Sequence, residues 1–109
     1  MLKGIVSNKN NSNEIFGVVK IVNINNFNNV KLNKNKDILI ISNTFIDLEP
    51  IMINSKAIIT EQGGLLSHAS IFSREFNIPC VVGVKNICSK LKDGDNIKID
   101  LITGKIYKI

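Results

Sequence analysis

The chain has 109 residues, and 14 Lys and Arg residues against 9 Asp and Glu residues give a net charge of +5 near neutral pH. This length predicts one domain over residues 1–109, and a hydrophobic content of 44% can supply its core. No apolar run approaches the roughly 20 residues that cross a bilayer, and the N-terminus lacks the apolar region of a signal peptide. The composition therefore predicts a soluble, cytoplasmic protein with no membrane partner.

The positive charge comes mostly from lysine, and Arg74 is the only arginine. The lysines are scattered or lie in the Asn- and Lys-rich segment 33–36, without interleaved aromatic residues that could stack on bases. We therefore interpret the charge as a solvated surface and expect no nucleic-acid partner. Cys80 and Cys88 lack the spacing of a zinc site, so both are expected to be free thiols, with Cys80 buried.

Apolar and alternating runs predict strands along the whole chain. They are expected near residues 2–6, 15–22, 37–42, 57–60, 80–84, 96–101 and 105–109, and the last two should form a hairpin. Gly17 lies inside the second run, which suggests a bulge or a close backbone approach. Segment 7–13 is predicted to be a polar turn, and segment 23–36 allows one helical turn at most around Phe27 and Val30.

Short helices are expected in segments 44–53 and 86–91. In the first of these, Thr44 or Asp47 could cap the helix, with Pro50 in its first turn. Strands that alternate with helices in this way predict an α/β domain.

A longer helix is predicted from Ser67 to Phe76, with Ser67 as its N-cap and Asn77 as its stop signal. Three apolar residues fall on one face of this helix and are predicted to pack inward: Ala69, Phe72 and Phe76.

The only histidine of the chain, His68, should lie at the start of this helix, just after a glycine turn at Gly63 and Gly64. The free amides and the dipole of a first helical turn favour an anion. A neutral imidazole there can attack phosphorus, and the same amides can hold the phosphoryl group. We therefore expect the ring of His68 to be at least partly exposed.

One ordered pattern runs through residues 60–83: T-x-x-G-G-x-x-S-H-A-S-I-x-x-R-E-x-x-I-P-x-V-V-G. It resembles the mobile phosphohistidine domain of phosphoenolpyruvate-utilising enzymes, a family that includes pyruvate phosphate dikinase, phosphoenolpyruvate synthase, enzyme I of the sugar phosphotransferase system and rifampicin phosphotransferase. Segments 37–40 and 92–107 also resemble the family, although Lys36 replaces a glycine. The resemblance covers essentially the whole chain and implies a swivelling β/β/α fold.

The resemblance also implies a function. In relatives this domain moves between two active sites, and its histidine carries a phosphoryl group between them, so His68 would be the nucleophile. Nothing in the sequence resembles an ATP-grasp domain or a phosphoenolpyruvate-binding barrel, so the expected partners are a separate nucleotide-binding protein, a phosphoenolpyruvate- or acceptor-binding protein, or both. No cofactor or metal is expected in this chain, and Mg²⁺ would belong to the partners.

Further residues of the pattern are expected to bind or support the phosphoryl group: Thr60, Gly63, Gly64, Ser67 and Arg74. Each also has a plain structural interpretation. The glycines could form an ordinary tight turn, the serine could act only as a cap, the arginine could form a surface ion pair with Glu75 or another acid, and the threonine could pin the loop through its hydroxyl. Thr44 and Asp47 are both candidates to orient the second ring nitrogen. Leu66 stands where some relatives have a regulatory threonine, so that regulation is not expected.

Three functions are compatible with these observations. The first is a phosphoryl carrier that is a phosphotransferase component but not a complete catalyst alone. The second is a non-catalytic regulatory or interaction module with the same fold, and the third is a detached fragment of a dikinase or synthase. The intact His68 favours the first over the second, and a resemblance over essentially the whole chain, together with an initiating Met1, favours a separate chain over a fragment.

Overall fold

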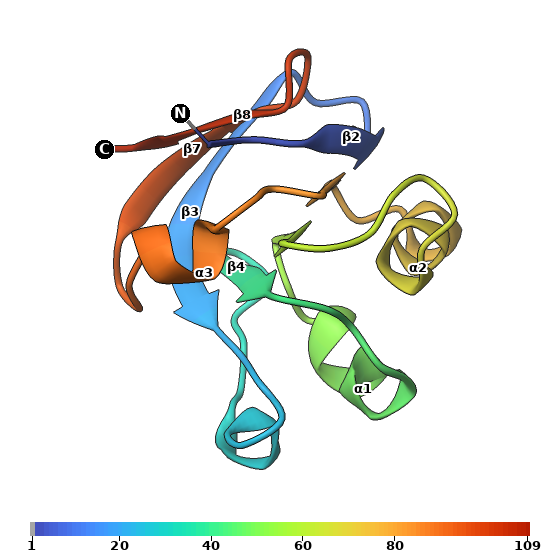
Figure 1. Ribbon diagram of the computed structural model, residues 1–109, viewed down its shortest axis with the longest axis vertical. Coiled ribbons are helices and arrows are strands. Elements are labelled where there is room, and N and C mark those ends of the chain that lie inside the picture. Colours follow the sequence, from blue (N-terminus) through green and yellow to red (C-terminus); the bar gives the residue numbers. More distant parts are fainter. Residues whose placement is uncertain (1) are drawn as a thin grey trace.

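The computed structural model describes residues 2–109, which form one eight-stranded mixed sheet with helices on both of its faces (Figure 1). The spatial order of the strands is β1-β8-β7-β3-β4-β5-β6-β2, and β3 to β6 run parallel to their neighbours in that series. The strands are β1 (Leu2–Lys3), β2 (Ile5–Asn8), β3 (Glu14–Ile21), β4 (Asp37–Ile41), β5 (Ala57–Thr60), β6 (Cys80–Val82), β7 (Asn96–Asp100) and β8 (Lys105–Lys108).

The helices are short except for one. Two are single 3₁₀ turns and three are α-helices: η1 (Phe27–Asn29), η2 (Ile46–Leu48), α1 (Glu49–Met52), α2 (His68–Phe76) and α3 (Ile87–Lys90). In Figure 1, α1 and α2 lie on one side of the sheet and α3 on the other. None of the helices formed by residues 2–109 is long and apolar enough to cross a membrane.

The central strands are buried on both faces, as their unbroken apolar runs predict. In β4, Ile38 and Ile40 join the cluster that includes Ile87 of α3, whereas Leu39 and Ile41 join the cluster under α1 and α2. This alternation follows from the period of two in a strand. The predicted α/β class and the swivelling β/β/α fold are therefore confirmed, and so is the hairpin of β7 and β8.

Parallel pairing places the ends of β4 and β5 at the same edge of the sheet. Ile41 is opposite Thr60 in the register, and the amide of Glu61 donates to the carbonyl of Ile41 at 3.0 Å. The amide of Gln62 continues the contact by donating to the carbonyl of Ser42 at 2.9 Å. The two loops that follow these strands consequently begin side by side, although they are about twenty residues apart in sequence.

The predicted strand at residues 2–6 is wrong as a single element. Gly4 divides it into β1, which pairs with β8, and β2, which pairs with β6 at the opposite end of the strand order. The amide of Gly4 donates to the carbonyl of Gly104 at 3.0 Å, and a Cβ on Gly4 would lie 2.5 Å from the carbonyl oxygen of Val82. The sheet is therefore curled until its two ends are joined through one glycine.

Three other local expectations are tested by the structure. The predicted polar turn at residues 7–13 begins later, because Ser7 and Asn8 extend β2 and the reversal occurs at Asn10 and Asn11, with φ of 52° and 58°. At Gly17 the close approach is confirmed, since a Cβ there would lie 2.6 Å from a side-chain carbon of Ile38 in the neighbouring strand. The single helical turn expected around Phe27 is η1.

Candidate functional site

His68 is the first residue of α2, and the helix begins there because Ser67 caps it. Ser67 has an extended backbone, and its hydroxyl oxygen accepts a hydrogen bond from the amide of Ser70 at 3.4 Å. The same hydroxyl donates to the carbonyl of Gly64 at 2.8 Å, so the cap also ties the helix to the glycine turn. The predicted helix start and N-cap are confirmed, and the hydroxyl proton is already used within the protein.

The far end of α2 agrees with prediction in backbone but not in side-chain packing. Asn77 takes the left-handed conformation with φ of 54° and ends the helix, and Ala69 and Phe72 are buried as expected. The expectation that Phe76 packs inward is wrong, because 47% of it is exposed. It lies on the same face as Ala69, but there the face borders an open hollow beside Pro50 rather than the sheet.

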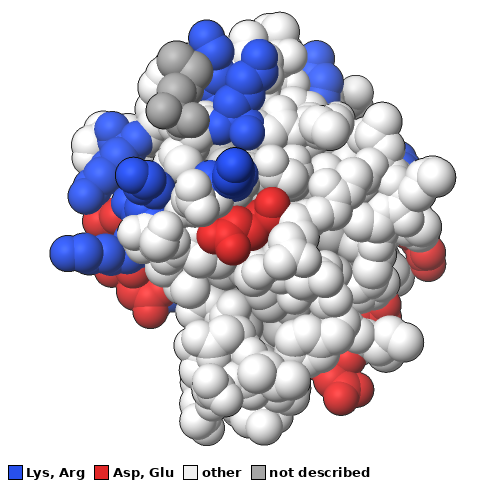
Figure 2. Space-filling model, in the orientation of Figure 1, with Lys and Arg blue, Asp and Glu red and all other residues white. Residues whose placement is uncertain are grey.

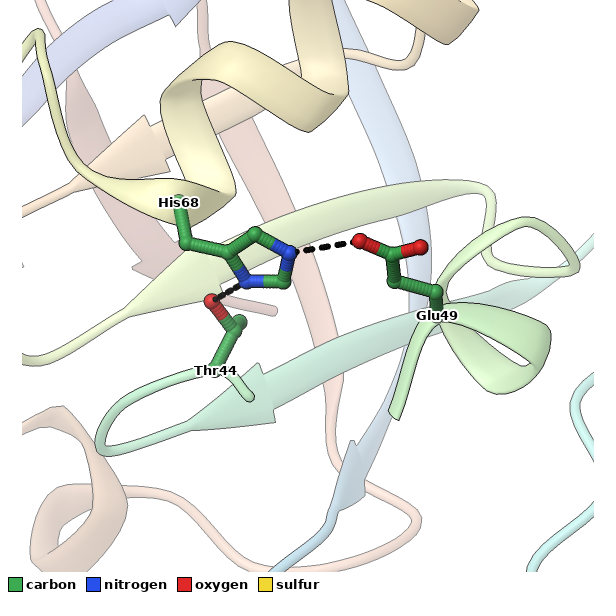
Figure 3. Close-up of polar contacts among 3 residues, drawn as sticks. All are labelled: Thr44, Glu49 and His68. Carbon is green, nitrogen blue, oxygen red and sulfur yellow. Dashed lines mark hydrogen bonds and ion pairs between the residues drawn. The ribbon is translucent and has the colours of Figure 1, made fainter. Parts of the chain in front are cut away.

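The imidazole of His68 is held between two side chains from the segment after β4 (Figure 3). Its Nδ1 atom lies 2.8 Å from Oγ1 of Thr44, and its Nε2 atom lies 2.7 Å from Oε2 of Glu49. The side chain of His68 is 32% exposed, which confirms the expected partial exposure. Both nitrogens therefore have polar partners within the chain, and the ring still reaches the surface.

The two partners of His68 come to it because the loops after β4 and β5 start side by side. Of the two candidates for orienting the ring, Thr44 contacts it and Asp47 forms no hydrogen bond to it. Neither residue caps a helix, so that expectation is wrong: α1 has Leu48 at its N-cap position, without a side-chain cap. Sequence reasoning missed Glu49. The available signal was that this carboxylate follows β4, a buried strand that runs parallel to β5, the strand before His68.

The glycine turn is shaped by Thr60 and Gly63. The hydroxyl of Thr60 donates to the carbonyl of Gln62 at 2.6 Å, so it pins the loop as expected. Gly63 has φ of +108°, a conformation that side chains other than hydrogen rarely allow, whereas a Cβ on Gly64 would meet nothing within 4 Å. The turn requires a glycine at the first of these two positions but not at the second.

Arg74 also belongs to the loop. Its Nη2 atom donates to the carbonyl of Leu65 at 2.7 Å. Among residues 2–109 it forms no ion pair, so the interpretation as a surface pair with Glu75 is wrong. Arg74 therefore joins the last part of α2 to the loop that precedes the helix, and in this loop Leu65 and Leu66 are 51% and 86% exposed.

The partners of His68 determine where the proton of its neutral ring lies. A carboxylate only accepts hydrogen bonds, so Nε2 must donate its proton to Glu49. Nδ1 then carries the lone pair and accepts a hydrogen bond from the hydroxyl of Thr44. This tautomer follows from the donor and acceptor capacities of the two partners. The site thus contains one ionisable nucleophile with a defined orientation.

Other reactive side chains lie apart from this arrangement. Both cysteines are free, as expected, and burial raises the pKa of the Cys80 thiol. Burial, and after it the charge of Glu61, raises the pKa of the Cys88 thiol to about 11. Within the described part of the chain, no group of three or more His, Cys, Asp or Glu residues could hold a metal ion.

Residues 33–104 match the family model described as PEP-utilising enzyme, mobile domain. The chain belongs to this family. It is 41% identical over 92 residues to the phosphoenolpyruvate synthase of Pyrococcus furiosus, in an alignment that covers 84% of this chain and 11% of that protein. It is 39% identical over 70 residues to the rifampicin phosphotransferase of Bacillus subtilis, covering 64% of this chain and 8% of that protein.

The fold comparison agrees with the sequence comparison. A solution structure of an Enzyme I protein superposes with a TM-score of 0.60 and 26% identity, over 76% of this chain and 33% of that chain. The resemblance described in the sequence analysis is confirmed. The chain spans about a tenth of the length of the curated relatives it matches. Family membership supports a phosphoryl-carrier role for the domain.

Proposed function

We propose that this chain carries a phosphoryl group on His68 between two active sites that belong to partners. The observation that carries the proposal is the position of His68, the only histidine, at the capped and partly exposed start of α2, with both ring nitrogens oriented. A histidine that served only as a packing residue would not need an exposed ring with two polar partners.

We assign the transfer to Nε2. Nδ1 faces Thr44 on the loop after β4, whereas Nε2 faces Glu49, whose side chain is 40% exposed. In the forward step Nε2 first loses its proton to solvent while Nδ1 gains one. The Nε2 lone pair freed in this way forms a bond to phosphorus while the bond from phosphorus to the donor oxygen breaks, and that oxygen keeps the electron pair. The reverse step at the second site transfers the group to the acceptor.

The surroundings of His68 suit a group that is held and then released. The dipole at the start of α2 stabilises a negative charge by roughly 0.3–1 kcal/mol at an exposed site, which is too little to trap the phosphoryl group. The turn at Gly63 and Gly64 is pinned by Thr60, and Ser67 ties it to the start of the helix that carries His68. We propose that these residues support the phosphoryl group through the loop that they shape, and that Arg74 contributes by anchoring Leu65.

The charge distribution supports the need for partners. On the face seen in Figure 2, the lysines gather mainly over the part that carries β7 and β8, whereas the part with α1 and α2 is mostly uncharged with some acidic residues. Most of the cationic groups that neutralise a phosphoryl group would therefore come from the partner. Several exposed apolar residues near His68 offer a surface on which a partner could dock: Leu65, Leu66, Ile71 and Phe76.

We propose that the partners are a nucleotide-binding component of the ATP-grasp kind, a phosphoenolpyruvate- or acceptor-binding component, or both. The Mg²⁺ that nucleotide and phosphoenolpyruvate chemistry uses would be held there, together with the phosphate oxygens of the donor. The proposal covers both a separate protein and a further domain as the partner.

The direct test is phosphoryl labelling of the purified chain by a donor enzyme and a labelled donor. We expect one group per chain, lost in mild acid and stable in base, as a phosphorus–nitrogen bond is. His68→Ala should abolish the label and keep the thermal unfolding of the wild type, since the position is partly exposed. Label that persists in His68→Ala, or that survives acid, would place the phosphoryl group on a hydroxyl and contradict the carrier role.

A further inference from the structure

Glu49 contacts the atom that we assign to phosphoryl transfer. Its Oε2 atom lies 2.7 Å from Nε2 of His68, and within residues 2–109 its side chain forms no other hydrogen bond. A carrier needs a nucleophile, but it does not need a carboxylate on the reacting atom. The contact therefore requires its own explanation.

Both ring nitrogens of His68 are blocked by a hydrogen-bond partner in this arrangement. Each ring nitrogen has a single outward direction in the plane of the ring, which holds a proton, a lone pair or a new bond. Nε2 directs its proton at Glu49, and the Nδ1 lone pair accepts from Thr44. Phosphorus would have to approach Nε2 along the line that Glu49 occupies. An anionic donor would in addition meet the negative charge of the carboxylate.

We infer that Glu49 masks Nε2 while the domain is undocked, and that a docking partner displaces it. This inference rests on the proposed function, because masking matters only if Nε2 receives a phosphoryl group. Once Glu49 moves away, Nε2 loses its proton to solvent and Nδ1 gains a proton from solvent. The N–H group at Nδ1 then donates a hydrogen bond to the hydroxyl oxygen of Thr44. Nε2 then has a free lone pair and forms the bond to phosphorus as the donor bond breaks.

The surroundings of Glu49 allow this movement. Glu49 is the first residue of α1, a helix of four residues, and its side chain is 40% exposed. It borders an open hollow of about 750 Å³ that Ile46, Asp47 and Phe76 also line. The carboxylate can rotate into this space without displacing a buried side chain. Masking and unmasking therefore require only a side-chain rotation.

The test uses phosphoramidate, a small donor that needs no partner protein. Nε2 bonds to phosphorus, the phosphorus–nitrogen bond of the donor breaks, and its nitrogen takes a proton from solvent and leaves as ammonia. Labelling of His68 is followed by phosphorus NMR in the wild type, Glu49→Ala, Glu49→Gln and Asp47→Asn. Asp47 is the matched control, because it lines the same hollow and carries the same charge but forms no hydrogen bond to His68.

We expect Glu49→Ala to be labelled about three- to tenfold faster than the wild type, the range supported by a charge-assisted hydrogen bond between partly exposed groups. Asp47→Asn should be labelled at the wild-type rate. Glu49→Gln fills the same space without the charge and should also exceed the wild type. A rate in Glu49→Ala that equals or falls below the wild type overturns the inference, because Glu49 would then not obstruct Nε2.

Nitrogen NMR of the ring gives a second measurement that involves no phosphoryl transfer. At a pH where the ring is neutral, its proton should lie on Nε2 in the wild type, and this preference should weaken in Glu49→Ala. A wild-type proton on Nδ1 overturns the inference. The two proposals fail separately: enzymatic labelling without faster reaction of Glu49→Ala rejects masking alone, whereas faster reaction without any enzymatic labelling rejects the carrier role alone.

Discussion

Gly63 and Gly64 are adjacent in the loop before His68, but a methyl group should have opposite consequences at the two positions. Gly63 has φ of +108°, and a Cβ there would lie 2.9 Å from Oγ and 3.0 Å from Cβ of Ser67. Gly64 does not have a positive φ, and a Cβ there would meet no atom within 4 Å. The pair Gly63→Ala and Gly64→Ala therefore isolates the effect of backbone conformation and contact from the general effect of adding a side chain.

The structure sets the size of the expected difference. A residue forced into this part of the backbone map costs about 1–3 kcal/mol. Displacement of Ser67 weakens the N-cap of α2, which is worth about 1 kcal/mol. Gly63→Ala should therefore lose about 2–4 kcal/mol of unfolding free energy, and in a domain of this size the melting temperature should fall by roughly 8–18 °C. Gly64→Ala should stay within about 0.5 kcal/mol of the wild type.

Thermal unfolding followed by circular dichroism measures this difference, and the ring resonances of His68 show whether the start of α2 has moved. The double variant Gly63→Ala with Ser67→Ala provides a check. Removing Oγ of Ser67 removes the closest contact of the new methyl group, so the double variant should lose less unfolding free energy than the sum of the losses in the two single variants. Equal losses in Gly63→Ala and Gly64→Ala would refute the reasoning, since the loop would then not depend on the conformation of Gly63.

Two further predictions concern Thr44 and Cys88. Thr44→Val removes the hydrogen bond to Nδ1, and enzymatic labelling of His68 should slow roughly two- to tenfold while Thr44→Ser stays near the wild type, which a time course of labelling measures. Cys88 should be alkylated slowly at pH 8, because its pKa of about 11 leaves few thiolates, and Glu61→Gln should speed alkylation measured by peptide mass spectrometry. Since the folded pKa exceeds the unfolded one, the contribution of Cys88 to stability should fall as the pH rises from about 8.5 through 11, which urea unfolding at several pH values measures.

The parts of the fold that depend on local pattern could be predicted from the sequence. β4 and β5 are short apolar runs that end at polar residues, and they lie where the sequence places them. The division of the first strand at Gly4 could not be predicted in this way. It depends on the meeting of the two ends of the sheet, where Gly4 bonds Gly104 one hundred residues later. Such a closure has no signal within the first ten residues.

The site divides in the same manner. His68 and its cap Ser67 belong to one local motif and were predicted in place. Glu49 reaches His68 only because β4 and β5 are parallel neighbours, and η2 places Glu49 rather than Asp47 against the ring. The hydrogen bond from Arg74 to the carbonyl of Leu65 could not be predicted from local sequence either. The position of Arg74 six residues after His68 does not show how the loop before the helix folds back towards it.

The location of Thr44 and Glu49 has a consequence for the proposed carrier. Both side chains belong to the same core-supported unit as His68, because the loops that hold them leave adjacent buried strands. They would therefore travel with the histidine to each partner, so the orientation of the ring and the proposed masking of Nε2 would be properties of the carrier itself. Cationic groups are few around α1 and α2 on the face seen in Figure 2, so neutralisation of the phosphoryl charge would fall mainly to each partner. A carrier built in this way protects its nucleophile between encounters and leaves the chemistry of donor and acceptor to the sites that it visits.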